Sequence, residues 1–473
     1  MNEGGLATPF RERAGRAMRD AFLQEALTIA TRKFIGLRRE AFDDFPEGDA
    51  LRDRARAIKE ATLQRLDHHL ERLVASVEGR GGRVHYATTP EEARAIVLDI
   101  ARRTGARMAV KSKSMATEEI HLNEALEAAG VTPVETDLGE YIIQLAHERP
   151  SHIIVPAIHK TKGQVADLFT RALKRRVEAD PEVLTRVARL ELREKFLQAD
   201  LGITGANFAV AETGTVVLVT NEGNGRMVTS LPRVHVAIMG VEKVVPSMTD
   251  LMVFLAILAR SATGQKLSVY TTLVEGPRRA GELEGPEEFH LVLLDHGRIA
   301  QIAGPLREAL SCLRCGACLN VCPVYQQIGG HAYGHTYPGP IGILLTAMLQ
   351  GPASVKDLAH ASSLCGACVD ACPVRIDIPR MLIGLRREVN ERRIASRRER
   401  VAFVLLGALL VRPVLYRLAV RLGRLVQRPF VRGGAVRDLP LVLGDWTRAR
   451  DLPPIAPRTF QERWATLERE GRP

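Results

Sequence analysis

The seven cysteines of this 473-residue chain all lie between Cys312 and Cys372. They fall into two groups, and each group ends with a cysteine that is followed by proline. Cysteine thiolates are the ligands of iron–sulfur clusters and of many zinc sites, so the clustering predicts a metal centre. The first group is Cys312-x2-Cys315-x2-Cys318-x3-Cys322-Pro323, and the second is Cys365-x2-Cys368-x3-Cys372-Pro373.

The spacing of these groups is similar to that of bacterial ferredoxins with two four-iron clusters. In those proteins three cysteines of a run ligate one cluster, and the fourth, before proline, ligates the other. Small residues such as Gly316 and Gly366 suit a chain that wraps closely around a cluster. Carried over to this chain, the pattern predicts a first cluster, of [4Fe-4S] type, on Cys312, Cys315, Cys318 and Cys372, and a second cluster on Cys322, Cys365 and Cys368.

One position departs from the pattern, because a complete second group would begin with cysteine at position 362 and this chain has Ser362. The second cluster therefore has three evident thiolates. Three alternatives stay open: a [3Fe-4S] cluster, a [4Fe-4S] cluster with Ser362 or another oxygen or nitrogen ligand, and a [4Fe-4S] cluster with one open iron. His331 and His335, in the glycine- and proline-rich insert between the groups, are candidate ligands, although packing within that loop is the favoured interpretation.

Two other uses of paired cysteines fit less well. A structural zinc site takes four ligands in a closed tetrahedron, and seven cysteines in ferredoxin spacing do not match it. Disulfides are disfavoured because no secretory signal is visible and the cysteines stand close together along the chain. Thiols committed to a cluster indicate the reducing cytoplasm.

The charge pattern restricts the partners. The chain has 66 Lys plus Arg against 55 Asp plus Glu, and the basic residues are densest over residues 386–428. Aromatic residues make up only 5% and do not alternate with the basic ones, as a stacking platform for single-stranded nucleic acid requires. We therefore expect no nucleic-acid partner.

Residues 81–300 alternate short apolar runs with amphipathic segments, which predicts an α/β domain with parallel strands and crossover helices. A helical segment is expected before it over residues 1–80, a ferredoxin-type domain after it over 301–385, and a basic helical region over 386–473. The expected strands are residues 107–110, 131–134, 152–155, 207–211, 216–220, 234–239 and 291–295. The expected helices include residues 21–39, 54–77, 118–129, 138–147, 164–173, 181–199, 343–350 and 378–400.

Two loops of the α/β domain carry reactive groups. Lys111, Ser112, Lys113 and Ser114 follow an expected strand and precede a helix start, where lysines, hydroxyls and free amides can hold an anion. An ordinary capped helix start is an equal alternative. Glu212 lies between two expected strands, as an acid, a base or a nucleophile, or simply as a turn carboxylate bonded to nearby amides. The sequence has no dinucleotide fingerprint and no Walker loop.

The C-terminal region contains an uncharged run over residues 401–411, then Arg412 and Pro413, and then arginines at helical spacing. The run is too short to span a membrane by itself. A helix that docks on a partner or on the α/β domain is the favoured interpretation, and a basic helix on a membrane surface is the alternative.

Together these features resemble the family of lactate utilisation protein B, the iron–sulfur subunits of the bacterial L-lactate utilisation system. The resemblance covers essentially the whole chain, and the serine at position 362 belongs to the family pattern. The matching stretches are FRER at residues 10–13, SKSM at 112–115, AETGT at 211–215, the cysteine group through residue 325, HAYG at 331–334, YPGP at 337–340 and SSLCGAC at 362–368.

The resemblance implies a LUD-type N-terminal domain similar in fold to NagB/RpiA-type sugar-phosphate isomerases and CoA transferases. It also implies a two-cluster ferredoxin-type domain and a family-specific C-terminal region. The implied partners are the other subunits of a cytoplasmic system that oxidises L-lactate to pyruvate: a cysteine-rich iron–sulfur protein and a second copy of the N-terminal fold.

We therefore expect an electron-transfer subunit whose two clusters relay electrons one at a time, with no catalytic residue assigned. The first alternative is a self-contained oxidoreductase in which the α/β domain binds lactate or another small carboxylate near Lys111, Lys113 and Glu212. The second is a redox-sensing scaffold without turnover.

Overall fold

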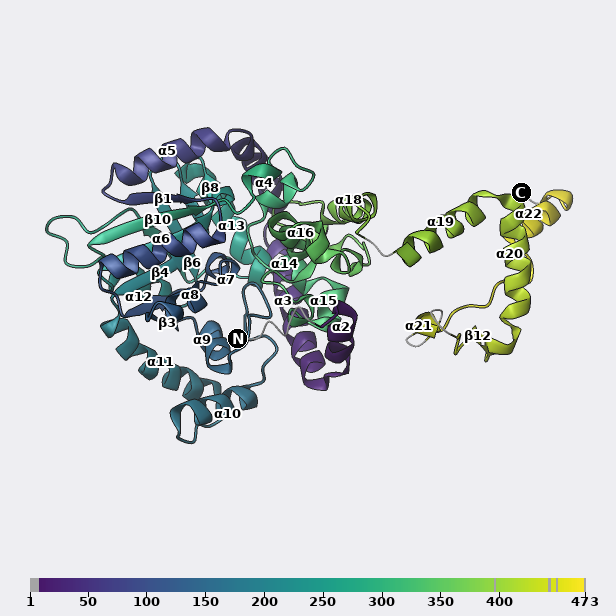
Figure 1. Cartoon of the computed structure of the whole chain (residues 1–473), viewed down its shortest axis with the longest axis horizontal. Coiled ribbons are helices and arrows are strands. Elements are labelled where there is room, and N and C mark those ends of the chain that lie inside the picture. Colours follow the sequence, from purple (N-terminus) through teal and green to yellow (C-terminus); the bar gives the residue numbers. More distant parts are fainter. Residues whose placement is uncertain (1–7, 395–396, 441–443, 448–449, 472–473) are drawn as a thin grey trace. The chain divides into compact units, whose positions relative to one another are not determined.

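The computed structural model describes residues 8–394, 397–440, 444–447 and 450–471. They form two compact units, one that extends to Glu391 and one that begins at Arg392. The first unit contains a parallel sheet and all seven cysteines, and the second contains the C-terminal helices (Figure 1).

A six-stranded sheet forms the centre of the first unit, and all neighbouring strands in it are parallel. The middle strands are buried on both faces, as expected where crossover helices cover a parallel sheet. In spatial order the strands are β1 (Arg83–Ala87), β10 (Glu288–Leu294), β7 (Val234–Gly240), β4 (Leu201–Gly205), β2 (Met108–Lys111) and β3 (Thr132–Glu135).

Helices pack on both faces of this sheet. Helix α5 (Leu66–Glu78) contributes to the core on one face, and α6 (Pro90–Arg103) with α8 (Leu122–Ala128) contributes to the core on the other. Side-chain caps fix several helix starts; the Thr89 hydroxyl, for example, accepts the Glu92 N–H before α6. The other helices here are α7 (Met115–Glu119), α9 (Leu138–Ala146), α10 (Lys162–Leu173), α11 (Pro181–Gln198), α12 (Asn224–Ser230) and α13 (Met248–Thr263).

The direction of winding reverses between β2 and β4, which are neighbours in the sheet. From β2 the chain moves outward to β3, whereas from β4 it moves through β7 to β10 in the opposite direction. Such a reversal leaves a crevice outside the carboxyl ends of the two strands, and ligands of open α/β sheets bind in crevices of this kind. A second, four-stranded sheet lies in the same unit, with strand order β8 (Val244–Val245), β5 (Phe208–Val210), β6 (Thr215–Thr220) and β9 (Tyr270–Val274).

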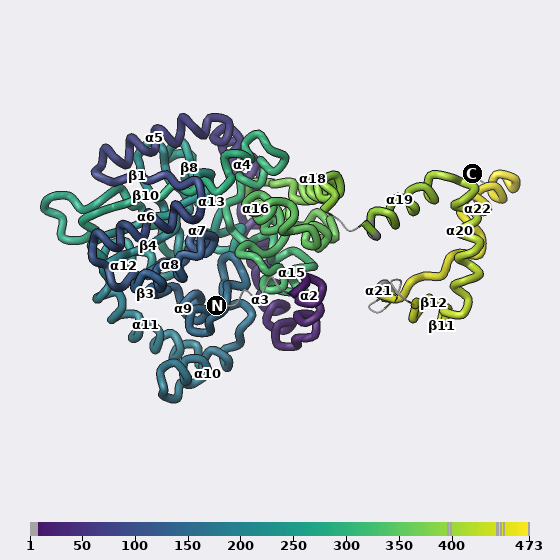
Figure 2. Tube along the Cα trace, viewed as in Figure 1, coloured from purple at the N-terminus to yellow at the C-terminus, as the bar shows by residue number. Residues whose placement is uncertain are grey.

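The cysteine-rich segment folds into short helices that contact the N-terminal helices. Figure 2 shows α2 (Phe10–Arg19) and α3 (Ala21–Asp43) beside α15 (Pro323–Ile328), although some three hundred residues separate them in the sequence. The segment also contains α14 (Ala317–Asn320), α16 (Gly339–Gln350), α17 (Ala367–Ala371) and α18 (Ile378–Glu391), and α4 (Gly48–Gln64) follows α3.

The second unit consists of helices and a short hairpin. Among the described residues, no single helix is both long and apolar enough to cross a membrane. Within the described part of the chain, one pair of helices, Arg400–Val411 and Pro413–Val426, reaches the required length and apolarity together, but it is bent by 106°. The elements of the second unit are α19 (Arg397–Val411), α20 (Pro413–Val426), β11 (Val431–Arg432), β12 (Ala435–Val436), α21 (Gly444–Thr447) and α22 (Phe460–Arg469).

The expected α/β region with a parallel sheet is confirmed, but several expected elements differ. Residues 152–155 are not a strand, because the His152 Nδ1 accepts the N–H groups of Ile154 and Val155 (3.1 and 3.2 Å) and turns the chain. The helix expected over 54–77 divides at Arg65, and the one over 118–129 divides at His121, which has a left-handed φ of 51°. The helix expected over 378–400 ends at residue 391. The boundaries at residues 80, 300 and 385 stay predictions.

Candidate functional site

Four cysteine side chains line one small buried cavity. They are 7–8% exposed, and three of them come from a single turn between residues 311 and 319. The fourth arrives from the end of α17, which packs against α14. These are the four cysteines that the ferredoxin spacing assigns to a first cluster, and they are called the four-thiol site: Cys312, Cys315, Cys318 and Cys372.

The electrostatics of the four-thiol site favour a bound cation. Burial, and then the neighbouring thiols, raise the pKa of Cys315 to about 12 and that of Cys318 well above its usual range. Burial also raises the pKa of Cys372 to about 11. Thiolates this close repel each other unless positive charge lies between them, and the iron ions of a cluster supply it. The donor set therefore fits a four-iron cluster.

Backbone geometry supports the same site. The N–H of Arg314 donates to the Cys312 sulfur (3.3 Å), and the N–H of Ile376 donates to the Cys372 sulfur (3.4 Å). Gly316 has a φ of +75°, and a Cβ atom there would lie 2.8 Å from the His152 ring. Only glycine suits this turn, because it needs both the left-handed backbone and the space.

The three other cysteines, Cys322, Cys365 and Cys368, form a second group, called the three-thiol site. Burial, then the charge of Cys322, raises the pKa of Cys368 to about 12. Cys365 is exposed, and the N–H of Ala367 lowers its pKa. The three-thiol site therefore reaches the surface of the first unit, whereas the four-thiol site is enclosed.

The two cysteine groups have matching backbone conformations. Arg314 and Leu364, each just before a cysteine, have φ of +61° and +56°, and Gly316 and Gly366 have φ of +75° and +86°. The two segments are thus repeats of one turn, and Ser362 occupies the position that matches Cys312.

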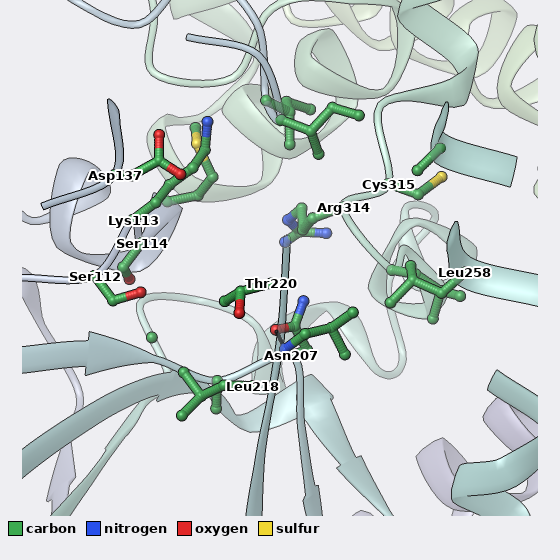
Figure 3. A pocket seen from close by; sticks show the side chains of 18 of the residues that line it. Ser112, Lys113, Ser114, Asp137, Asn207, Leu218, Thr220, Leu258, Arg314 and Cys315 are labelled. Carbon is green, nitrogen blue, oxygen red and sulfur yellow. Dashed lines mark hydrogen bonds between the residues drawn. The ribbon is translucent and has the colours of Figure 1, made fainter. Parts of the chain in front are cut away.

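A second, larger cavity of about 510 Å³ lies at the carboxyl ends of the parallel strands, where the direction of winding reverses. Figure 3 shows Ser112, Lys113 and Ser114 on one side of it and Cys315 on the other, with Arg314 between them. This space is called the sheet-end cavity. Cys315 lines both cavities, so the sheet-end cavity directly adjoins the four-thiol site.

Charged groups of both signs line the sheet-end cavity. Lys113 pairs with Glu140 on α9 (3.3 Å), and the guanidinium of Arg314 donates to Glu242 (3.0 Å). Lys243 follows β7 and is 8% exposed. Burial, then the charge of Arg314, lowers the pKa of Lys243 to about 7.

Comparison with known proteins identifies three regions. A family model for the LUD domain matches residues 70–294, one for a 4Fe-4S dicluster domain matches residues 308–376, and one for the C-terminal part of lactate utilisation protein B matches residues 387–469. The chain is 44% identical to lactate utilization protein B of Shouchella clausii over 98% of both chains. It is 42% identical to that of Bacillus subtilis over 98% of this chain and 97% of the relative.

The chain belongs to the lactate utilisation protein B family. It is also 43% identical, over 96% of both chains, to an uncharacterized electron transport protein of Escherichia coli. A crystal structure of a DUF162 family protein from Deinococcus radiodurans is similar to 48% of this chain, with 13% identity and a TM-score of 0.27.

In this member of the lactate utilisation protein B family, the two predicted loops have different roles. The Ser114 hydroxyl caps α7 by accepting the Thr117 N–H (3.3 Å), so the loop is a capped helix start, and Lys113 lines the sheet-end cavity. Lys111 does not reach that cavity, because it forms a buried ion pair with Glu135 (2.6 Å).

Glu212 also lies away from the sheet-end cavity. Its side chain is 43% exposed and accepts the Met248 N–H (3.2 Å). This contact matches the alternative of a turn carboxylate bonded to an amide, and neither Lys111 nor Glu212 lines the sheet-end cavity. His331 and His335 bond through Nε2 to the carbonyls of Arg149 (2.6 Å) and Ser354 (3.3 Å), which is packing within the first unit.

Sequence reasoning missed two features of the site. Lys243 is one, although its sequence context gave a signal: a Glu-Lys pair interrupts the mostly apolar run that continues from β7 into β8. The other is a brace from α4, where the Arg52 guanidinium donates to the carbonyls of Cys372 (2.8 Å) and Asp370 (2.6 Å). The N-terminal helices thus hold the chain around the four-thiol site.

Proposed function

We propose that this chain is an iron–sulfur electron-transfer subunit of a cytoplasmic system that oxidises L-lactate to pyruvate. The four-thiol site would hold a [4Fe-4S] cluster. The three-thiol site would hold a second cluster, of [4Fe-4S] or [3Fe-4S] type. Bound clusters of this kind accept and donate single electrons. The dicluster match and the names of the relatives support this role.

The observation that carries the proposal is the placement of the two sites. The four-thiol site is enclosed and adjoins the sheet-end cavity through Cys315, whereas the three-thiol site reaches the surface at Cys365. Residues of this chain therefore offer an inner end, next to a ligand cavity, and an outer end, where another protein can approach. With an electron donor at the inner end and an electron acceptor at the outer end, the chain would relay electrons between them.

The stoichiometry of lactate oxidation is compatible with such a relay of single electrons. Conversion of L-lactate to pyruvate releases two electrons and two protons, and single-electron carriers must take the electrons in two steps. Because the sequence contains no nicotinamide fingerprint, the other subunits of the system are proposed to remove them from lactate. The LUD region is proposed to have a NagB/RpiA/CoA-transferase-like fold, which its parallel sheet and its cavity at the strand ends support.

A second function has one observation in its favour. In a self-contained oxidoreductase, the sheet-end cavity would bind a small carboxylate, with Lys113 in its wall and Cys315 within reach. That arrangement would place substrate chemistry in this chain.

One anaerobic experiment separates the two functions. The full-length chain, purified with its clusters, is mixed with L-lactate in the presence or absence of the presumed partner subunits, and bleaching of the cluster absorbance is followed. Bleaching only with the partners is the expected result. Bleaching by lactate alone would move the chemistry into this chain, and no bleaching in either case would overturn the lactate assignment. Cys368→Ser, which removes a ligand of the three-thiol site, should slow transfer to an external acceptor.

A further inference from the structure

Lys243 is a buried lysine that is unpaired among the residues that the structure describes. Its side chain lines the sheet-end cavity and is 8% exposed, and no hydrogen bond or ion pair to it is present among the described residues. A buried ammonium without a counter-charge is costly, and proteins normally pair it or neutralise it. The lowered pKa of Lys243 has this same cause, burial first and then the nearby Arg314.

The carboxylate next to Lys243 in the sequence, Glu242, already pairs with other residues. Glu242 accepts a hydrogen bond from Arg314 (3.0 Å) and pairs with Arg298 (2.8 Å). Arg298 also pairs with Glu119 (2.7 Å), so two arginines balance two carboxylates in this buried network. Lys243 therefore forms no ion pair with this network of described residues, although the charges of Glu242 and of the Cys312 thiol both act on it.

Two other carboxylates that line the cavity accept backbone hydrogen bonds. Asp137 caps α9 by accepting the N–H groups of Gly139 and Glu140 (3.1 and 3.3 Å), and Glu222 accepts the Leu138 N–H (3.3 Å). A further buried cation, Lys59, donates to the backbone carbonyl of Glu242 behind the cavity. None of these carboxylates forms a hydrogen bond or an ion pair with Lys243 among the described residues.

We propose that the sheet-end cavity binds a small anion, a carboxylate or a phosphate, whose charge pairs with Lys243 beside the four-thiol site. The volume of about 510 Å³ lies within the range of small-molecule sites. The inference rests on the proposed function, since it takes Cys315 as a ligand of the first cluster.

The anion and the first cluster are then coupled by charge. Arg314 lies between the ligands Cys312 and Cys315 and also lines the sheet-end cavity, so the two sites share a wall. A nearby anion opposes the addition of an electron to the cluster, and by linkage the addition of an electron weakens anion binding by the same factor. A tenfold loss of affinity on reduction corresponds to a potential lowered by about 59 mV in a one-electron couple.

The test uses the full-length chain with both clusters assembled anaerobically. The potential of each cluster is measured by electron paramagnetic resonance during redox titration, with saturating L-lactate, pyruvate or inorganic phosphate and with chloride as reference. We expect one class of anion to lower the potential of the first cluster by about 59 mV for each tenfold difference in affinity. Comparison of the shifts with lactate and pyruvate against the shift with phosphate shows whether the cavity binds carboxylates or phosphates.

Variants assign the effect to Lys243. Lys243→Gln should abolish the shift, Lys243→Arg should keep it, and Lys162→Gln, at an exposed lysine on α10, should leave it unchanged. A wild-type potential that no anion moves, or a full shift in Lys243→Gln, overturns the proposal. If Lys243→Gln fails to fold, the wild-type titration still tests binding, and loss of the shift in Lys243→Arg would count against pairing by charge.

The same data distinguish two kinds of failure. Absence of the first cluster, judged from iron content and its resonance signal, contradicts the proposed function. A first cluster that is present but insensitive to every anion contradicts only this inference.

Discussion

Ser362 makes the same backbone hydrogen bond as Cys312, the residue that it matches in the repeat. The Ser362 hydroxyl accepts the Leu364 N–H at 3.2 Å, and the Cys312 sulfur accepts the Arg314 N–H at 3.3 Å. The serine oxygen is therefore held where a fourth cluster ligand of the three-thiol site would lie.

Replacement of this serine tests the nature of the second cluster. Ser362→Cys supplies a fourth thiolate in the ligand geometry, so we expect a complete four-iron second cluster with cysteine ligation. Iron and sulfide analysis with Mössbauer spectroscopy measures this. Ser362→Ala is the companion variant: loss of one iron would show that the wild-type serine is a ligand, and unchanged iron content would show that it is not.

Tyr333 is expected to raise the reduction potential of a cluster. Its hydroxyl is buried without a hydrogen-bond partner among the described residues, and the thiols of Cys322 and Cys318 are among its electrostatic neighbours. A hydroxyl that donates to cluster sulfur stabilises the reduced form. Tyr333→Phe should therefore lower a cluster potential by roughly 40 mV, equivalent to a hydrogen bond of about 1 kcal/mol. Tyr86→Phe, at a half-exposed tyrosine on β1, should change neither potential.

The brace from α4 should matter for stability. Arg52 is 6% exposed and donates to the carbonyls of Asp370 and Cys372, and its bond to Cys372 is buried, so Arg52→Ala leaves a buried acceptor unpaired. We expect the free energy of unfolding of the first unit to fall by about 2–4 kcal/mol, measured by urea denaturation. Arg54→Ala, at an exposed position of the same helix, should cost less than about 0.5 kcal/mol. Equal effects of the two variants would contradict the brace.

His152 should make stability depend on pH. Burial, then the charge of Lys113, lowers its pKa from 6.5 to about 3. Its neutral Nδ1 accepts the N–H groups of Ile154 and Val155. Below pH 6.5 the unfolded chain binds a proton at His152 that the folded chain does not. The contribution of His152 to the free energy of unfolding is therefore complete above pH 6.5 and is lost as the pH falls toward 3.

Because of His152, we expect the free energy of unfolding to fall by about 1.4 kcal/mol between pH 7.5 and 5.5. The measurement is urea denaturation at both pH values for the wild type and His152→Gln. The variant should be less stable at pH 7.5 but should lose less stability on acidification. Parallel pH profiles for the two proteins would contradict this assignment.

The sequence predicted the parts of the site that depend on local spacing. Ligands of one cluster must lie close together, so Cys312, Cys315 and Cys318 could be grouped by counting residues, and the proline-linked Cys372 could be added through the ferredoxin pattern. The parallel sheet was predictable because its middle strands are buried on both faces and are apolar throughout.

The rest of the site depends on long-range packing that spacing does not encode. Lys113, Lys243 and Arg314 meet at one cavity only because of the strand order and the docking of the cysteine segment on the sheet. The strand expected over 152–155 failed for a different reason, since one histidine ring takes the amides that a strand would pair.

The contact between Arg52 and Cys372 spans 320 residues of sequence, and this separation sets the order of events when the protein is made. At about 5–20 residues per second, a ribosome needs roughly 15–60 seconds to pass from one residue to the other. For most of that interval α4 is complete, but Arg52 has neither of its carbonyl partners, Asp370 and Cys372. Iron delivery to the proposed four-thiol cluster must therefore come late in synthesis, because a cluster inserted before residue 372 would lack its fourth cysteine and the carbonyl through which Arg52 braces it.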